Sequence, residues 1–187
     1  MREPLLMLAA GLFAALIGGP AAATGIQIEV AGEANGTIII DLLEDIAPQH
    51  VRRITTLAAE GAYDGVVFHR VIEGFMAQTG DVEFGLAGGD MRRAGMGRSN
   101  LPNVPAEFSD VPFDRGVVGM ARSQNPNSAN SQFFIMFSEG YFLNGQYTVI
   151  GRVTAGQEVV DAIKRGAGPN GAVIGAPDMM RSVTVID

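Results

Sequence analysis

Residues 68–81 read FHRVIEGFMAQTGD, two short runs of strand-forming residues that Gly74 separates. Successive side chains of a strand point to opposite faces of a sheet. We therefore expect Phe68, Arg70 and Ile72 to share one face of the first run. The pattern predicts a strand that presents a single cation beside apolar side chains.

The second run, residues 75–79, adds a thioether and an amide. Met76 and Gln78 share one face by the same alternation and are expected next to the face that carries the cation. The alternation places Phe75 on the opposite side, unless the chain twists after Gly74.

Two later segments, NSANSQFFI at residues 127–135 and FLNGQYTVIG at residues 142–151, are equally distinctive. Within a strand here, Gln132, Phe134 and Met136 share one face. If this face meets the one that carries the cation, a guanidinium and amides lie beside aromatic and thioether groups. Such a surface suits a neutral ligand that is mostly apolar but carries amide carbonyls.

The rest of the chain reads mainly as short strands. Residues 26–30 and 36–43 form a predicted hairpin with residues 33–36 in its turn. Helices are expected at about residues 47–59, where Pro occupies the first turn, and at residues 158–164. Further strands are expected at residues 66–72, 75–79, 117–121, 133–137, 148–153 and 182–186. Many short strands with two separated helices favour an antiparallel barrel or sandwich.

The composition excludes several kinds of chemistry. The chain has 187 residues, no Cys, two His and a formal net charge of −7. Without Cys there are no disulfides, thiolate zinc sites or cysteine nucleophiles. The negative charge argues against a partner made of nucleic acid or anionic membrane. We expect neither a metal nor a cofactor.

The two histidines leave one catalytic alternative open. We expect His50, near the start of the first helix, on a solvated face, and His69 in a structural role. The alternative is a hydrolase that uses His69, because a catalytic triad of the Ser-His-Asp type needs a histidine.

Residues 1–23 differ from the rest of the chain. Arg2 precedes an apolar run at residues 5–17, and three alanines follow just before Thr24. This pattern is typical of a secretory signal that is cleaved before Thr24. We expect residues 24–187 to be one exported domain, in the periplasm, without stable membrane association after cleavage. The alternative is an uncleaved membrane anchor, since the segment could just span a bilayer.

Residues 68–81, 127–135 and 142–153 resemble, in order and spacing, the motifs FHRVIxGFMxQxGD, NSxxSQFFI and xLxGxxTVxGxV of the cyclophilin-type peptidyl-prolyl cis-trans isomerases. The likeness covers nearly all of residues 26–187. It implies a mainly β fold, a closed eight-stranded antiparallel barrel capped by two α-helices. It also implies rotation of X-Pro bonds in proline-containing segments of unfolded or partly folded proteins, in a chain that we expect to be a monomer. The alternative is a non-catalytic module that holds such segments in the same groove.

The resemblance implies roles for single residues. Arg70 matches the catalytic arginine, and Gln78 and Gln132 match amides that hold the substrate backbone and position that arginine. Ala121 and Arg122 match a stretch at the edge of the groove. Other positions that match the substrate groove are Phe75, Met76, Phe134, Phe142, Leu143 and Tyr147. At Phe75 the resemblance contradicts the strand alternation.

Some positions depart from the common pattern of the family. Phe142 stands where many members have a Trp that hydrogen-bonds cyclosporin, so we expect weak binding of that macrocycle. Tyr147 stands in place of His, Arg122 in place of Asn, and Glu73 in place of Pro. These departures bear on drug sensitivity and sequence preference and leave the reaction intact.

Residues 86–105 match the family least. They carry Arg92, Arg93 and Arg98 and predict a solvated basic loop. The alternative is that this loop selects an acidic client protein.

Overall fold

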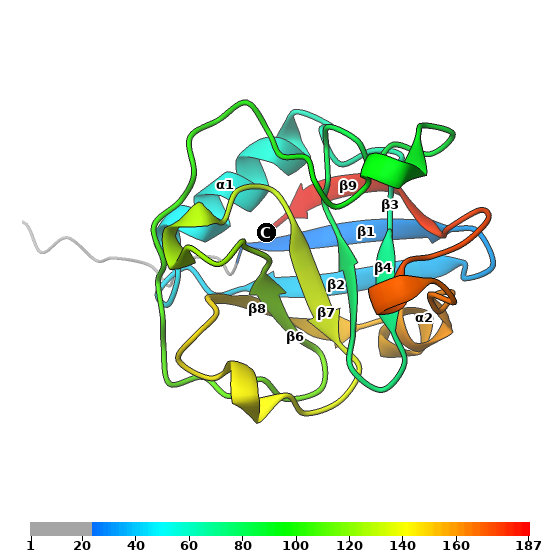
Figure 1. Ribbon diagram of the computed structural model, residues 1–187. Coiled ribbons are helices and arrows are strands. Elements are labelled where there is room, and N and C mark those ends of the chain that lie inside the picture. Colours follow the sequence, from blue (N-terminus) through cyan, green and yellow to red (C-terminus); the bar gives the residue numbers. More distant parts are fainter. Residues whose placement is uncertain (1–23) are drawn as a thin grey trace, which may run out of the picture.

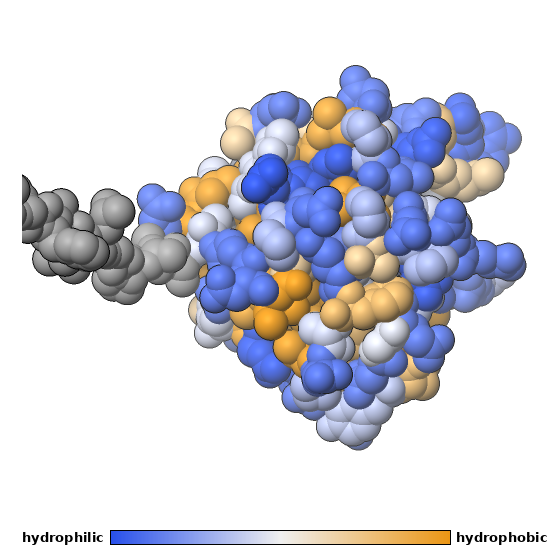
Figure 2. Space-filling model, turned by 90° about the vertical axis from the view of Figure 1, so that its left-hand side faces the viewer, coloured by the Kyte–Doolittle hydropathy of each residue, from blue (hydrophilic) through white to orange (hydrophobic). Residues whose placement is uncertain are grey.

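The computed structural model of the protein describes residues 24–187, which form a curled antiparallel sheet with two α-helices (Figure 1). The predicted signal segment lies outside these described residues. Within residues 24–187, no helix is long and apolar enough to cross a membrane. On the face seen in Figure 2, apolar residues occupy small areas that hydrophilic residues surround. The expectation of a mainly β fold is confirmed.

The sheet begins with the predicted hairpin, formed by β1 (Gly25–Ala31) and β2 (Gly36–Leu42). In its turn, the Asn35 side-chain amide donates a hydrogen bond to the carbonyl of Gly32 at 2.7 Å. The register brings isoleucines of the two strands face to face, and all of them are buried in the interior: Ile26, Ile28, Ile38 and Ile40.

Seven further strands complete the sheet: β3 (Val66–Val67), β4 (Arg70–Ile72), β5 (Met76–Thr79), β6 (Val117–Met120), β7 (Phe133–Met136), β8 (Val149–Ala155) and β9 (Met179–Ile186). Their order is β3-β9-β1-β2-β8-β6-β7-β5-β4, and every neighbouring pair is antiparallel. The outermost strands, β3 and β4, are separated in the chain only by Phe68 and His69. The sheet therefore curls until its two edges meet in one stretch of chain. The sequence predicts eight strands, and nine are present because the predicted strand at residues 66–72 is divided into β3 and β4.

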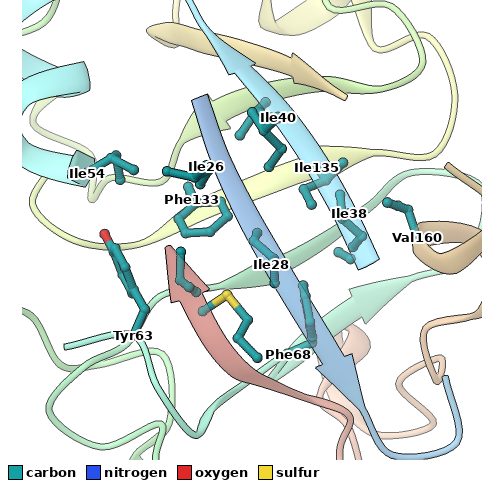
Figure 3. Close-up of a cluster of buried hydrophobic side chains, with 14 of the residues drawn as sticks. Ile26, Ile28, Ile38, Ile40, Ile54, Tyr63, Phe68, Phe133, Ile135 and Val160 are labelled. Carbon is teal, nitrogen blue, oxygen red and sulfur yellow. The ribbon is translucent and has the colours of Figure 1, made fainter. Parts of the chain in front are cut away.

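The two helices cover opposite ends of the apolar interior. Figure 3 shows Ile54 of α1 (Pro48–Ala59) at one end of the buried cluster and Val160 of α2 (Gln157–Ala162) at the other. The helix α1 begins at its proline, as predicted, and turns its apolar stripe inward. Together the helices seal the interior that the curled sheet leaves open at its ends.

The helix α2 is shorter than the predicted span of residues 158–164. It ends at Ala162, because the backbone of Ile163 is extended, with ψ of 130°. The next amide, that of Lys164, donates to a carboxylate oxygen of Asp178 at 2.7 Å. The buried carboxylate of Asp178 thus accepts a hydrogen bond from the Lys164 amide, which in a longer helix would donate to a backbone carbonyl.

Phe68 does not share a face with Arg70, contrary to the prediction from strand alternation. Phe68 is fully buried in the interior together with Val66 and Val71, whereas Arg70 lies on the outer side of the sheet. Where the strand is interrupted, the Phe68 amide donates to the carbonyl of Asp178 at 2.9 Å. The alternation slips by one residue at this interruption.

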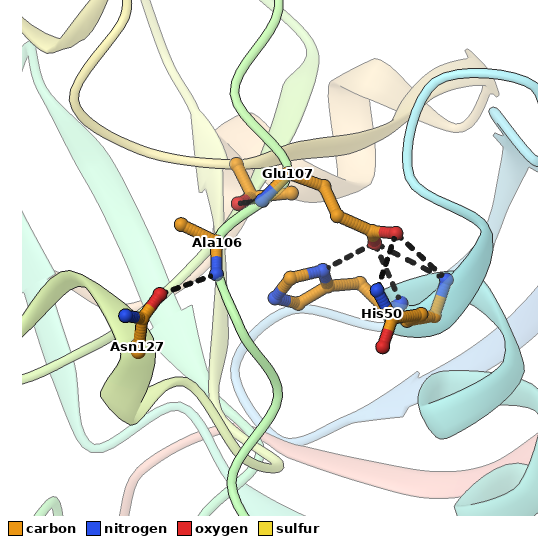
Figure 4. Close-up of polar contacts among 6 residues, drawn as sticks. His50, Ala106, Glu107 and Asn127 are labelled. Atoms are coloured by element: carbon orange, nitrogen blue, oxygen red, sulfur yellow. Dashed lines mark hydrogen bonds and ion pairs between the residues drawn. The ribbon is translucent and has the colours of Figure 1, made fainter.

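The prediction of a solvated His50 is also wrong, since its side chain is 0% exposed. Its Nδ1 atom lies 2.7 Å from Oε2 of Glu107, and the same carboxylate accepts from the backbone amides of Gln49 and His50 at 3.1 Å (Figure 4). These amides lie in the first turn of α1, which has no side-chain cap at Ala47. A carboxylate distant in sequence therefore caps this helix.

The segment that carries Glu107 is fixed by two further hydrogen bonds. The Glu107 amide donates to Oγ1 of Thr148 at 3.0 Å, and the Ala106 amide donates to Oδ1 of Asn127 at 2.9 Å (Figure 4). Asn127 opens one of the motif segments and Thr148 belongs to the other. The start of α1 is thus tied to both segments.

Candidate active site

Arg70 belongs to a row of residues that lie opposite one another across four strands. The register pairs Arg70 of β4 with Gln78 of β5, Gln78 with Phe134 of β7, and Phe134 with Gly119 of β6. Directly opposite residues of antiparallel strands point to the same face. The cation, the amide and the aromatic ring therefore lie side by side on the outer face, as the alternation predicted.

Gly119, which no pattern in the sequence singled out, makes room for this row. A Cβ atom at Gly119 would lie 2.6 Å from the ring of Phe134 and equally close to that of Phe113. The two rings stack with their centroids 5.8 Å apart. Only a residue without a side chain leaves space for the stack.

Two side-chain amides, those of Gln78 and Gln132, form a chain of hydrogen bonds that ends at the cation. The Nη1 atom of Arg70 donates to Oε1 of Gln78 at 3.1 Å, and Nε2 of Gln78 donates to Oε1 of Gln132 at 2.9 Å. The Nε2 atom of Gln132 donates to the carbonyls of Gly95 and Gly97, at 3.1 and 2.8 Å. Because carbonyls only accept, the direction of the whole chain is set. Gln78 must therefore turn its oxygen toward the guanidinium.

The opposite edge of the guanidinium contacts Asn170. Nε of Arg70 donates to the main-chain carbonyl of Asn170, and Nη2 donates to its Oδ1, both at 3.0 Å. Burial lowers the pKa of Arg70, yet a guanidinium stays protonated at neutral pH. Within residues 24–187, Arg70 forms no ion pair. The site holds a fixed and uncompensated positive charge.

A cavity of about 260 Å³, with an apolar floor and polar side chains at its walls, opens beside this charge. Met76, Phe134 and Leu143 are buried in its floor and belong to an apolar cluster separate from the interior of the sheet. Of the predicted site residues, only Gln132 is absent from its lining. The lining consists of Arg70, Phe75, Met76, Gln78, Ala121, Arg122, Phe134, Phe142, Leu143 and Tyr147.

Phe75 lies at the cavity, where the resemblance places it and the alternation does not. It precedes β5, and Gly74 before it has a φ of 69°, a conformation that favours glycine. This turn frees Phe75 from the alternation of the strand. Its ring packs against that of Phe142 with centroids 5.4 Å apart, and Phe142 itself is 67% exposed at the rim.

Arg122 is held at the other side of the cavity by neutral groups. Its guanidinium lies over the ring of Tyr147 at 4.2 Å, and its Nη2 atom donates to the carbonyl of Gln146 at 2.7 Å. Arg122 also lines a neighbouring cavity of about 380 Å³, together with Gln132 and Arg98. No Asp or Glu lines this second cavity.

The basic loop is solvated, as predicted, but its arginines differ. Arg92 is exposed and pairs with Asp90 at 2.8 Å, while Arg93 is exposed and lies over the ring of Phe84 at 3.6 Å. Arg98 is the one that borders a cavity next to the site. Selection of an acidic client stays a prediction, and it rests on Arg98.

His69 is buried and lies outside both cavities. Its side chain is 7% exposed, and burial lowers the pKa of its imidazole to about 4. Neither ring nitrogen has a hydrogen-bond partner in the part of the chain that the structure describes. A triad histidine needs a hydroxyl at one ring nitrogen and a carboxylate at the other, and His69 hydrogen-bonds neither, so it does not form the base of a hydrolase of this type. Among residues 24–187 no group of three His, Asp or Glu side chains could hold a metal ion.

Known protein sequences resemble this chain over most of its length. The sequence model of the family described as "Cyclophilin type peptidyl-prolyl cis-trans isomerase/CLD" matches residues 26–185. The chain is 58% identical over 153 residues to a probable peptidyl-prolyl cis-trans isomerase of Brucella suis, which covers 81% of this chain and 78% of that protein. It is 38% identical over 138 residues to a peptidyl-prolyl cis-trans isomerase of Streptomyces antibioticus, covering 69% and 78%.

Solved structures share the fold. A cyclophilin type peptidyl-prolyl cis-trans isomerase of Cryptosporidium parvum, crystallised in the presence of the dipeptide Ala-Pro, matches with a TM-score of 0.73 and 25% identity, over 87% of this chain and 99% of that one. A cyclophilin of Hirschia baltica matches with a TM-score of 0.70 and 27% identity, over 86% and 73%.

Proposed function

The chain belongs to the cyclophilin type peptidyl-prolyl cis-trans isomerases, and on this premise we propose how its residues share the reaction. Membership gives the activity: the chain catalyses the cis-trans isomerisation of X-Pro bonds and binds proline-containing peptides. The assignment of single residues to steps of this reaction is our proposal.

The reaction needs no covalent intermediate. Amide resonance makes rotation slow, with a barrier of about 20 kcal/mol. When the bond is twisted, the lone pair localises on the proline nitrogen, which becomes pyramidal and accepts a hydrogen bond. A cationic donor fixed at that nitrogen binds the twisted state better than either planar state and so lowers the barrier. We assign this donor to Arg70.

The cavity holds the proline ring while the carbonyl on its other side turns. This role falls to the buried floor and to Phe75 at its edge. Gln78, Gln132, Ala121 and Arg122 lie where an extended peptide can hydrogen-bond beside the ring. Phe142 and Tyr147 form the rim.

One observation carries the assignment of Arg70. Its guanidinium is held on two edges by neutral acceptors, at the border of a cavity with an apolar floor, with its charge uncompensated. A module that only held peptides would gain little from a half-buried, unpaired cation at this place. A group that must stabilise a transient lone pair needs both the fixed position and the free charge.

The test compares Arg70→Ala with wild type and with Arg52→Ala, a control at an exposed arginine of α1. The assay follows cis-to-trans relaxation of a short X-Pro peptide, and binding of the same peptide is measured separately by NMR titration. We expect Arg70→Ala to lower kcat about a hundredfold, as for loss of one transition-state donor, with a much smaller change in affinity. Equal rates for wild type and Arg70→Ala would overturn the assignment. The non-catalytic alternative predicts peptide binding in all three proteins and no dependence of the rate on Arg70.

We further propose that the chain is exported to the periplasm and cleaved before Thr24. The apolar run and the three alanines before Thr24 support this proposal. A contact of Thr24, the first residue after the proposed cleavage, also supports the proposal, because its backbone nitrogen donates to Oε1 of Glu44 at 2.8 Å. Cleavage converts this amide into an ammonium group, which then makes a charge-assisted hydrogen bond with the carboxylate.

Mass spectrometry of the protein from separated periplasmic and membrane fractions tests the export proposal. We expect a periplasmic species that starts at Thr24. A full-length chain confined to the membrane fraction would support the anchor and refute cleavage.

We also propose that the protein acts as a monomer. The predicted groove residues come together within one chain, and on the face seen in Figure 2 the apolar areas are small and separated, as expected where no obligate partner binds. Sedimentation at micromolar concentration is expected to give the mass of one chain, and a dimer mass would contradict the proposal.

A further inference from the structure

Asn170 has an unusual backbone conformation. It lies in the single-turn helix η4 (Pro169–Gly171) with φ of 55° and ψ of 30°, and no other non-glycine residue in 24–187 has a positive φ. This left-handed region is unfavourable for residues with a side chain, although Asn tolerates it better than most. Glycine would occupy this position without strain, so the presence of Asn together with its hydrogen bond to Arg70 points to a task for its side chain.

The side chain and the main chain of Asn170 together accept two of the donors of Arg70. A guanidinium has five N–H groups. Asn170 accepts from Nε and from Nη2, and Gln78 accepts from Nη1. One N–H group therefore remains on each terminal nitrogen, and these two are available to a substrate at the cavity.

The loop that carries Asn170 is attached to the strand that carries Arg70. The Gly166 amide donates to the carbonyl of Val71 at 2.9 Å, and the Val173 amide donates to the carbonyl of His69 at 3.0 Å. These bonds lie on either side of Asn170 in the chain. The acceptor and the cation therefore hold a constant relative position.

The acceptor is also neutral. A carboxylate at the same place would orient the guanidinium equally well, but it would neutralise the charge that the twisted amide needs. The amide of Asn170 orients the guanidinium and leaves the charge available.

We propose that Asn170 is a positioning residue of the isomerase, which fixes the guanidinium of Arg70 along one edge without compensating its charge. The proposal rests on the role assigned to Arg70 above. It extends the machinery to a loop one hundred residues away in sequence, which no motif of the chain includes.

The first test is Asn170→Gly, because glycine keeps the main-chain carbonyl and the left-handed backbone and removes only Oδ1. We expect kcat to fall about tenfold, the loss typical of a hydrogen bond to a charged group, with KM within about twofold of wild type. The melting temperature is expected not to fall, because glycine relieves the strained φ. Asn100→Gly, at an exposed loop position away from the site, is the matched control and should keep wild-type kinetics.

A double-mutant cycle shows whether Asn170 acts through Arg70. In the Arg70→Ala background, Asn170→Gly should have no further effect on kcat. An unchanged kcat in the single variant, or an equal loss in both backgrounds, would overturn the proposal. Should Arg70→Ala itself keep the wild-type rate, the role of Arg70 fails. A loss in Arg70→Ala with full activity in Asn170→Gly refutes the role of Asn170 alone.

Asn170→Asp tests the importance of neutrality. Both acceptors remain, so the Nε–H resonance of Arg70 should stay protected from exchange with water, while kcat falls because the added charge compensates the guanidinium. A kcat equal to or above that of wild type would refute this part of the proposal.

Discussion

Acidification from pH 7 to pH 4 is expected to destabilise the protein through His69. Burial lowers the pKa of this imidazole to about 4 in the folded state, against about 6.5 in an unfolded chain. As the pH falls below 6.5 the unfolded state takes up the proton first. The contribution of His69 to stability is therefore complete above pH 6.5 and is lost progressively between pH 6.5 and pH 4.

The difference between a pKa of about 6.5 and one of about 4 corresponds to about 3.4 kcal/mol at a pH below both values, and about 3 kcal/mol of it is lost by pH 4, where half of the folded molecules are protonated at His69. The imidazole is a suitable group for this estimate, since its side chain is only 7% exposed. A loss of this size is a substantial part of the roughly 5–15 kcal/mol that stabilises a typical domain.

The assay is urea denaturation of wild type and His69→Leu at pH 7, 5.5 and 4, at constant ionic strength. Leucine removes both unpartnered ring nitrogens and keeps a similar volume, so the variant should fold. His50, whose pKa burial also lowers, titrates in both proteins and cancels in the difference. We expect the wild type to lose about 3 kcal/mol more than the variant over this range. Parallel losses, within about 0.5 kcal/mol, would refute the reasoning.

Four further substitutions test the site and its support. Gly119→Ala is expected to lower kcat/KM about tenfold, because the new methyl group would lie 2.6 Å from the ring of Phe134 and push it into the cavity; unchanged kinetics would show that the rings can move aside. Phe142→Trp supplies an indole donor at a side chain that is 67% exposed, so inhibition by cyclosporin should tighten, and an unaltered inhibition curve would contradict this. Glu107→Gln removes the charge that caps α1 and should lower the free energy of unfolding at pH 7 by about 1–2 kcal/mol, measured in urea, whereas wild-type stability would contradict the cap. Arg98→Glu should lower kcat/KM several-fold for peptides with an acidic residue before the proline and leave neutral peptides unaffected, an effect that must vanish in high salt to be electrostatic.

The sequence was sufficient for those parts of the fold that depend on local chemistry. The turn at Asn35 and Gly36 and the proline at the start of α1 each act through a few neighbouring residues, and both elements appear as predicted. Gln132, just before β7, and Phe134 within it both lie beside Gln78, so the face that they share could also be predicted from the period of a strand.

The errors arise where a long-range contact overrides the local pattern. Phe68 turns inward because the strand is interrupted by a hydrogen bond to Asp178, more than one hundred residues away. His50 is buried because a carboxylate at residue 107 reaches the start of its helix. Asn170 lies beside Arg70 only in the folded chain. Contacts between residues so far apart in the chain cannot be deduced from the spacing of residues in the sequence.

The position of β9 in the sheet determines when the protein can finish folding. Among the nine strands of residues 24–187 it comes last in the chain, yet it lies between β1, which comes first among them, and β3. A chain that leaves a ribosome or a translocation pore from its N-terminus keeps an open edge on β1 until residues 179–186 have emerged. Pairing between strands so far apart in the chain makes folding slow and dependent on residues 179–186. Until these residues pair with β1 and β3, the curled sheet cannot close.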